Sequence, residues 1–148
     1  MGRSSLNLYY QITRSRSLGP LPTYLDMSDA DVLRLIQKHV RIGIWRSDLE
    51  AGHTFCSAEA SRLFGVPVTQ GPIDFGMASR SIHPEDQALA LELIETAARE
   101  KGSYQFVMRV KEGGVGPYIH VRVMGRFRAK GNSGGEIIGV CHEIPAGV

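Results

Sequence analysis

The sequence predicts an α+β fold, a five-stranded antiparallel sheet with helices on one face and an N-terminal amphipathic helix. Three stretches between residues 104 and 144 alternate apolar and polar residues, as half-buried strands do. Two shorter strand-like stretches precede them, and helical segments lie between the two groups. The two early strands must therefore pair with the three late strands across a helical insert. A chain of 148 residues suffices for one such domain.

The N-terminal region divides into two parts. Residues 1–27 show no clean periodicity and contain glycine and prolines, so we expect a flexible tail or linker. Ser28 followed by Asp31 is a helix-start signal, and residues 28–41 then predict an amphipathic flanking helix. The apolar positions on one face of this helix are Val32, Leu35, Ile36 and Val40.

The next segment predicts a hairpin followed by a short helix. Residues 42–48 form a strand in which Ile44 and Trp45 point to opposite faces, so we expect both faces of this strand to be covered. A second strand begins after the turn at residues 49–52. Residues 57–64 then predict a short helix, and residues 68–81 are expected to form loops.

The second half of the chain contains the clearest helix signal. Pro84 suits the first helical position, and Glu85 and Asp86 favour the positive end of the helix dipole. The helix should run to Lys101. Three strands follow over residues 104–111, 118–128 and 136–144. The polar face of the middle strand predicts a sheet side that is open to solvent or to a partner.

Charge and cysteine content exclude several classes of protein. The net charge of +2 arises within residues 1–27, whereas the rest of the chain is balanced, so we expect no nucleic-acid partner. No apolar run reaches the ~18 residues of a membrane span, so no membrane association is expected. Cys56 and Cys141 cannot form a disulfide framework, which favours a reducing, cytoplasmic location.

Five phrases, in this order, resemble a PAS domain over about residues 42–145. The phrases are Gly43–Gly52 (the opening strand and turn), Ser57–Gly65, the His-Pro-Glu-Asp helix entry Ile82–Asp86, Tyr104–Val110, and the closing strand Gly139–Ile144. One departure stands at the end, where Pro145 occupies a position that the family fills with threonine, and proline lacks a backbone donor. Whether the chain is a stand-alone protein or the input module of a sensor kinase or similar regulator is left open.

The resemblance implies a sensory or signalling domain without enzymatic activity, which binds a small ligand or a protein partner and transmits a conformational change. Two alternatives for the apolar positions of strands and helices remain open, since they either border a ligand cavity or simply fill the core. The candidate cavity residues are Ile44, Phe55, Phe64, Leu91, Ile94, Phe106, Met108, Val121, Val123 and Val140.

Cofactor motifs of the family are missing from this sequence. Photosensory members carry a reactive cysteine in an Asn-Cys-Arg-Phe phrase, and haem-binding members carry a histidine in the long helix; neither occurs here. Flavin and haem are therefore disfavoured, and the cofactor is unknown. No His or Cys pair has metal-ligand spacing, so no metal is expected. We also expect no catalytic residues.

The flanking helix offers a candidate partner surface. Its apolar stripe packs either on its own sheet or on the same helix of a second chain, and both contacts can coexist. The resemblance implies a homodimer and an effector such as a kinase or a cyclase. The partner candidates are Val32, Leu35, Ile36, Val40 and Trp45.

Overall fold

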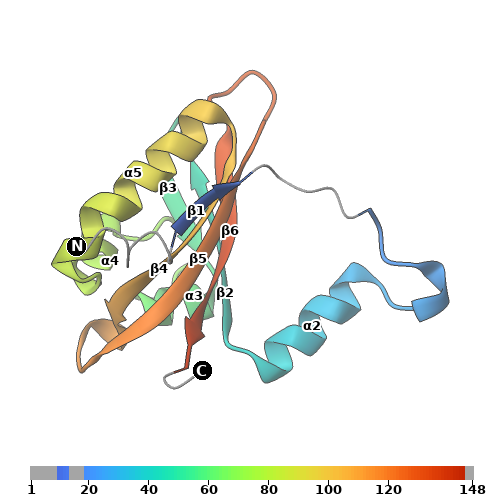
Figure 1. The fold of residues 1–148 in the computed structure, drawn as a ribbon, viewed down its shortest axis with the longest axis horizontal. Helices are drawn as coiled ribbons and strands as arrows, with labels where there is room; N and C mark the ends of the chain where they lie inside the picture. Colours follow the sequence, from blue (N-terminus) through green and yellow to red (C-terminus); the bar gives the residue numbers. More distant parts are fainter. Residues whose placement is uncertain (1–9, 14–18, 146–148) are drawn as a thin grey trace.

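The computed structural model describes residues 10–13 and 19–145. Its described strands form one six-stranded antiparallel sheet in the order β1-β4-β5-β6-β2-β3 (Figure 1). The elements are β1 (Tyr10–Thr13), η1 (Thr23–Leu25), α2 (Asp29–His39), β2 (Ile42–Asp48), β3 (His53–Cys56), α3 (Ala58–Leu63), α4 (Phe75–Ser81), α5 (Pro84–Glu100), β4 (Ser103–Lys111), η2 (Glu112–Gly114), β5 (Tyr118–Arg128) and β6 (Glu136–Ile144).

Helices α3, α4 and α5 lie on one side of the sheet, which we call the inner face, and α2 projects from the other side, the outer face (Figure 1). The long helix α5 packs against β4, β5 and β6, and α3 packs against β2. This arrangement confirms the predicted α+β class with its helices on one face and an N-terminal amphipathic helix. The capping box of Ser28 and Asp31 also forms at the start of α2.

All five predicted strands form, whereas strand β1, helix α4 and the short 3-10 helices η1 and η2 were not predicted. Strand β1 lies within residues 1–27, which the sequence analysis assigned to a tail, and it pairs with the edge of β4. Its four residues are too few for a periodic signal, and pairing with an open sheet edge rather than local preference explains the strand. Helix α4 occupies a segment expected to be loop; Asp74 caps its start by accepting from the Met77 backbone N–H at 3.0 Å.

The hydrophobic core fills the space between the inner face and α5. Alternate residues of β4 are buried and face α5, as the predicted period of two requires. Helix α5 contributes small residues, Ala90 and Ala97, together with Leu93. The short alanine side chains allow the helix to approach the sheet closely.

The register of β2 corrects part of the sequence analysis. Trp45 was assigned to the partner surface, but it points to the inner face, pairs with Gly139 and is 9% exposed. A Cβ atom on Gly139 would lie 2.5 Å from the Trp45 ring, so glycine provides the room for the indole. Because successive strand residues alternate, Ile44 and Val140 point to the outer face and cannot line an inner cavity. Phe55 is corrected in the same way, since it pairs with the outward Arg46.

A buried ion pair, which we call the Asp86–Arg109 clamp, joins the start of α5 to β4. The Asp86 side chain is 8% exposed and accepts hydrogen bonds from the Arg109 backbone N–H at 2.8 Å, from Nε at 3.0 Å and from Nη2 at 2.8 Å. The His83 backbone N–H donates in turn to the Arg109 carbonyl at 2.8 Å. Burial raises the pKa of Asp86, but the bonds from Arg109 outweigh it and hold that pKa below its ordinary value.

Replacement of Asp86 by alanine should lower the free energy of unfolding by about 3 kcal/mol, because it leaves the Arg109 backbone N–H without its acceptor and leaves the guanidinium only the exposed Glu85 carboxylate, 3.1 Å from Nη2. The clamp stabilises the fold fully above the unfolded pKa of aspartate, about 4, and this stabilisation falls as the pH drops through the lower folded pKa. Urea titrations at neutral and acid pH measure both effects. If the clamp contributed nothing to stability, the free energy of unfolding of Asp86→Asn would change between pH 6 and pH 3 as it does in the wild type.

Candidate functional site

A cavity of about 240 Å³ lies between the inner face of the sheet and helices α4 and α5, and it is partly open to solvent beside Leu91 and Phe75. We call it the inner cavity. Its wall comes from four strands, β2, β3, β4 and β5, and from the helices above them, so the packing of α5 on the sheet helps to determine its shape. The lining residues are Trp45, Ser47, Thr54, Cys56, Phe64, Ile73, Phe75, Ala78, Ser79, Ile82, Gln87, Ala90, Leu91, Ile94, Tyr104, Phe106, Met108 and Val123.

The wall of the inner cavity carries no charged side chain and few polar ones. Ser47 and Thr54 satisfy each other through a hydroxyl–hydroxyl hydrogen bond of 2.7 Å. Burial raises the pKa of the Cys56 thiol to about 11, so this thiol is neutral near pH 7. A charged molecule would lose its hydration in this cavity without gaining a counter-ion, whereas an apolar molecule would gain favourable burial.

Tyr104 contributes a buried phenol to the wall. Its residue is 2% exposed, and its ring lies over Gly125, where a Cβ atom would be 2.8 Å from two ring carbons. Among the described residues, no group forms a hydrogen bond with its hydroxyl. Burial raises the pKa of this phenol, so the hydroxyl stays protonated and able to donate. The wall thus contains one buried donor that has no partner among the described residues.

The structure brings six of the ten predicted cavity residues to the inner cavity: Phe64, Leu91, Ile94, Phe106, Met108 and Val123. Val121 is buried in the core beside them but does not line the cavity. Sequence reasoning missed the polar pair Ser47 and Thr54, because the direction of β2 was ambiguous where Ile44 and Trp45 are both apolar. It also missed the residues of α4, a helix that it did not predict.

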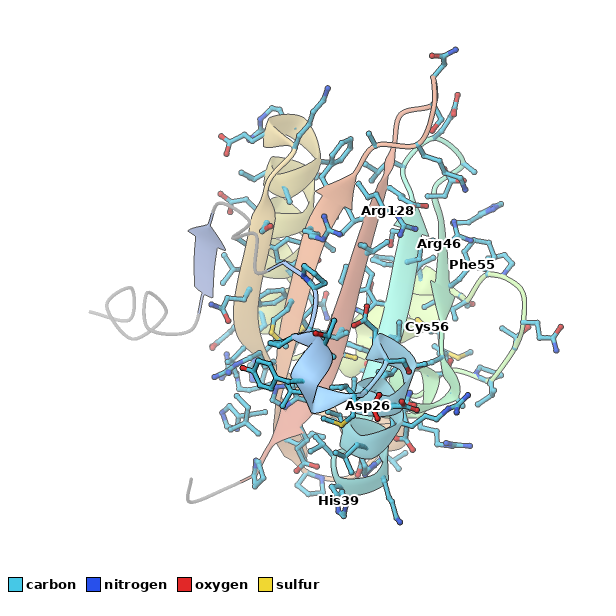
Figure 2. All side chains as sticks on the ribbon, turned by 90° about the vertical axis from the view of Figure 1, so that its right-hand side faces the viewer. Asp26, His39, Arg46, Phe55, Cys56 and Arg128 are labelled. Carbon is cyan, nitrogen blue, oxygen red and sulfur yellow. The ribbon has the colours of Figure 1, made fainter. Side chains whose placement is uncertain are left out.

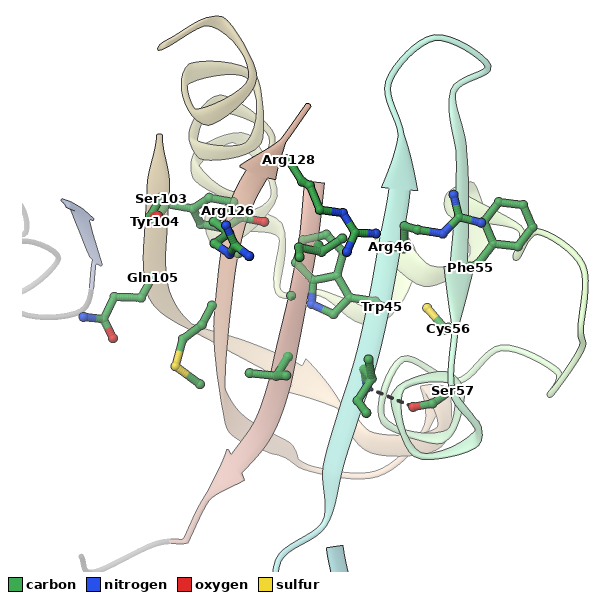
Figure 3. A pocket seen from close by; sticks show the side chains of 16 residues that line it. Trp45, Arg46, Phe55, Cys56, Ser57, Ser103, Tyr104, Gln105, Arg126 and Arg128 are labelled. Carbon is green, nitrogen blue, oxygen red and sulfur yellow. Dashed lines mark hydrogen bonds between the residues drawn. The ribbon is translucent and has the colours of Figure 1, made fainter. Parts of the chain in front are cut away.

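A second, open hollow of about 910 Å³ lies on the outer face, over β6 and its neighbouring strands (Figure 3). We call it the outer hollow. Ile44, Val140 and Met124 form one cross-strand row of its floor, and Ile138 extends this apolar surface. Trp45, Cys56 and Tyr104 border both the outer hollow and the inner cavity, so the two sites share part of their walls.

Three arginines stand at one end of the outer hollow: Arg46, Arg126 and Arg128 (Figure 3). Glu136, whose side chain is 2% exposed, accepts from Arg128 Nε at 2.5 Å and from Arg46 Nη1 at 3.4 Å. Burial raises the pKa of Glu136, but the neighbouring arginines outweigh it and keep the carboxylate charged. Asp48 lies opposite Glu136 in the same row of the sheet, and Lys130 Nζ lies 3.9 Å from Glu136 Oε1. Two carboxylates therefore stand beside three guanidinium groups and one ammonium group, which leaves this end of the hollow positively charged.

Helix α2 has no buried residue, and its apolar side chains lack cover in the single chain. Leu35 is 54% exposed, and Ile36 and Val40 are exposed as well, whereas Val32 is half-buried. Exposed apolar patches are a common feature of interaction surfaces. Four of the five predicted partner residues therefore lie on an open face, and Trp45 does not.

Two searches for other chemistry give negative results over residues 10–13 and 19–145. No three His, Cys, Asp or Glu side chains among them gather as ligands for a metal ion. No helix in the same residues is long and apolar enough to cross a bilayer. The acidic and basic clusters described above instead connect elements of the sheet and its helices.

Comparison with solved structures identifies the fold. The chain superposes with a TM-score of 0.57 on the N-terminal domain of a diguanylate cyclase with PAS/PAC sensor from Marinobacter aquaeolei, at 15% identity over 69% of this chain and 94% of that one. A sensory box histidine kinase/response regulator from Burkholderia thailandensis gives 0.58, at 18% identity over 76% and 83%. A domain of a histidine kinase described as light and redox sensing, from Haloarcula marismortui, gives 0.61, at 15% identity over 77% and 98%.

These neighbours show that the chain has a PAS fold, as the sequence phrases predicted. Searches against protein-family models and curated proteins yield no match. At identities of 18% or less, the likeness concerns the fold, and function has to be argued from the two sites.

Enlarging one residue of the cavity wall tests whether the inner cavity is unfilled volume in the folded protein. Ala90→Leu directs three more carbons into the cavity and should leave the free energy of unfolding unchanged or slightly higher. Ala97→Leu is the matched control, because Ala97 is fully buried on the same helix and does not line the cavity, so overpacking should lower that energy by about 1–3 kcal/mol. Chemical denaturation measures both; equal destabilisation of the two variants would contradict the cavity.

Proposed function

We propose that this chain is a non-enzymatic sensory module that binds a small, uncharged, mainly apolar molecule in the inner cavity and passes the change on to an effector. The observation that carries the proposal is a mainly apolar cavity bordered by the sheet, α4 and α5, with no charged residue in its wall. The PAS fold shared with sensory portions of kinases and a cyclase supports it.

The size and the polar groups of the cavity narrow the ligand class. A cavity of about 150 Å³ accommodates benzene, and the inner cavity measures about 240 Å³, so a molecule with one or two rings fits. The Tyr104 hydroxyl lacks an acceptor among the described residues, which favours a ligand with one hydrogen-bonding group. Both features together favour a small aromatic or alicyclic compound.

The shared walls give a route from the ligand to the outer face. Trp45, Cys56 and Tyr104 border the inner cavity and the outer hollow, so a ligand that moves them alters the surface on the other side of the sheet. A ligand with different affinities for two arrangements of this sheet shifts their populations. A kinase or a cyclase domain is the kind of effector that the structural neighbours carry.

A second candidate function is a pure dimerisation or interaction module. The observation in its favour is the exposed apolar stripe of α2, which requires a partner rather than a ligand. A homodimer through this helix is compatible with ligand binding, because α2 contributes no residue to the inner cavity.

Indole should raise the melting temperature of the purified chain by several degrees at saturation, because a ligand that binds only the folded state stabilises it. Indole-3-acetate, which adds a carboxylate, should produce no comparable shift, since the wall offers no counter-charge. Differential scanning fluorimetry measures both shifts.

Ala90→Leu narrows the cavity and serves as the control, in which the indole shift should shrink or vanish. Equal shifts with the two compounds, or an undiminished shift in Ala90→Leu, would contradict binding in the inner cavity. No shift with either compound would leave the interaction module as the better account.

A further inference from the structure

Tyr104 lies in a row of the sheet that crosses two glycines before it reaches Trp45. The strand register pairs Tyr104 with Gly125, Gly125 with Gly139, and Gly139 with Trp45. A Cβ atom on Gly125 would lie 2.8 Å from the Tyr104 ring and 2.9 Å from its hydroxyl oxygen, and one on Gly139 would lie 2.5 Å from the Trp45 ring. The two aromatic side chains therefore cover the glycines from opposite sides, and the Tyr104 hydroxyl points along the sheet toward Trp45 (Figure 3).

The Tyr104 hydroxyl is a buried donor that needs an acceptor. The residue is 2% exposed, and no described residue forms a hydrogen bond with its oxygen. Burial raises the pKa of the phenol, and the Cys141 thiol adds to this effect, so the proton stays on the oxygen. A buried donor without an acceptor is costly in a folded protein, so a bound molecule that supplies the acceptor gains this bond.

Other polar side chains of the cavity wall are already engaged. The hydroxyls of Ser47 and Thr54 bond each other at 2.7 Å. Gln87 Nε2 donates to the Ile82 carbonyl at 2.9 Å, which holds this amide at the junction of α4 and α5. Tyr104 is the residue of the wall whose buried polar atom has no partner among the described residues.

Charged side chains lie on the other side of the sheet. Figure 2 looks onto the outer face and shows Arg46 and Arg128 close to each other at one end, where both bond Glu136. The wall of the inner cavity contains no charged side chain. A charged acceptor such as a carboxylate would therefore lose its hydration there without a counter-ion, whereas an uncharged carbonyl oxygen or ring nitrogen needs only the Tyr104 proton.

We propose that Tyr104 selects the ligand of the inner cavity by donating a hydrogen bond to an uncharged acceptor, a carbonyl oxygen or an aromatic ring nitrogen, on a molecule of one or two rings. This role rests on the ligand binding proposed above and adds the polarity of the bond. A ligand that only donates can bond the phenol oxygen but leaves the phenol proton unpaired. The acceptor end of the ligand lies beside Trp45, and its rings lie against Phe106 and the side of α5 that lines the cavity.

Two compounds of the same shape separate the hydrogen bond from apolar burial. Naphthalene and quinoline are both uncharged near neutral pH, and quinoline differs by one ring nitrogen, which accepts but does not donate. Titrations followed by NMR of the isotope-labelled chain give the dissociation constant of each compound for the wild type and for Tyr104→Phe. The substitution should weaken quinoline binding about 10-fold, because the nitrogen loses its donor, and should leave naphthalene binding unchanged.

Tyr118→Phe is the matched control, since Tyr118 is 38% exposed and does not line the inner cavity. Both dissociation constants should stay at their wild-type values in this variant. Tyr104→Phe should keep at least the wild-type free energy of unfolding in urea, because it removes a hydroxyl that has no described partner. A clear loss of stability would mean that the hydroxyl already has an acceptor in the free protein, which overturns the role of Tyr104.

The outcomes separate this role from ligand binding itself. If Tyr104→Phe weakens both compounds equally, Tyr104 shapes the cavity without bonding the ligand, and its selecting role is wrong while ligand binding stands. An unchanged affinity for quinoline in Tyr104→Phe leads to the same conclusion. If neither compound binds the wild type up to its solubility limit, the ligand-binding proposal is wrong and the role of Tyr104 is wrong with it.

Discussion

The buried Asp86 carboxylate and the Arg109 guanidinium determine where α5 begins relative to β4, and the inner cavity depends on that position. Asp86 opens the helix, and Arg109 lies on the strand that supplies Tyr104, Phe106 and Met108 to the cavity wall. From Asp86 onward, α5 crosses the sheet with its small residues Ala90 and Ala97 against the strands. An ion pair with one buried partner holds its geometry because separating the charges leaves the carboxylate uncompensated. The clamp therefore helps to determine how far α5 lies from the inner face of the sheet.

The alternation of the strands then divides the chemistry between two faces. The inner face carries the aromatic row of Tyr104 and Trp45, which covers Gly125 and Gly139 between them. The outer face carries the apolar row and the arginines. Because one sheet forms a wall of both sites, the proposed ligand can affect the outer face through the shared residues Trp45, Cys56 and Tyr104. A coupling of this kind needs only a different affinity of each site for two arrangements of the sheet.

Much of the fold follows from the sequence, because alternation over β4, β5 and β6 and the start signal of α5 are strong local patterns. The direction of β2 does not follow from the sequence, since Ile44 and Trp45 are both apolar. Tertiary contacts decide between them: Gly139 lies opposite Trp45, and Gly43, on the same face as Trp45, packs against Ala60 of α3. Strand β1 forms by pairing with β4, which is distant in the sequence, and the Asp86–Arg109 clamp joins residues 23 positions apart. Local sequence patterns therefore predict neither feature. The apolar stripe of α2 was predicted, but the outer hollow was not, because its lining residues come from separate strands.

Native mass spectrometry of the freshly purified chain, compared with its denatured mass, tests the central claim most directly, because it reports bound molecules and assembly together. The account predicts a dimer that carries a reproducible extra mass, with the size of a molecule of one or two rings, on each chain. A bare monomer under gentle ionisation would contradict the account of a ligand-binding, self-associating sensor.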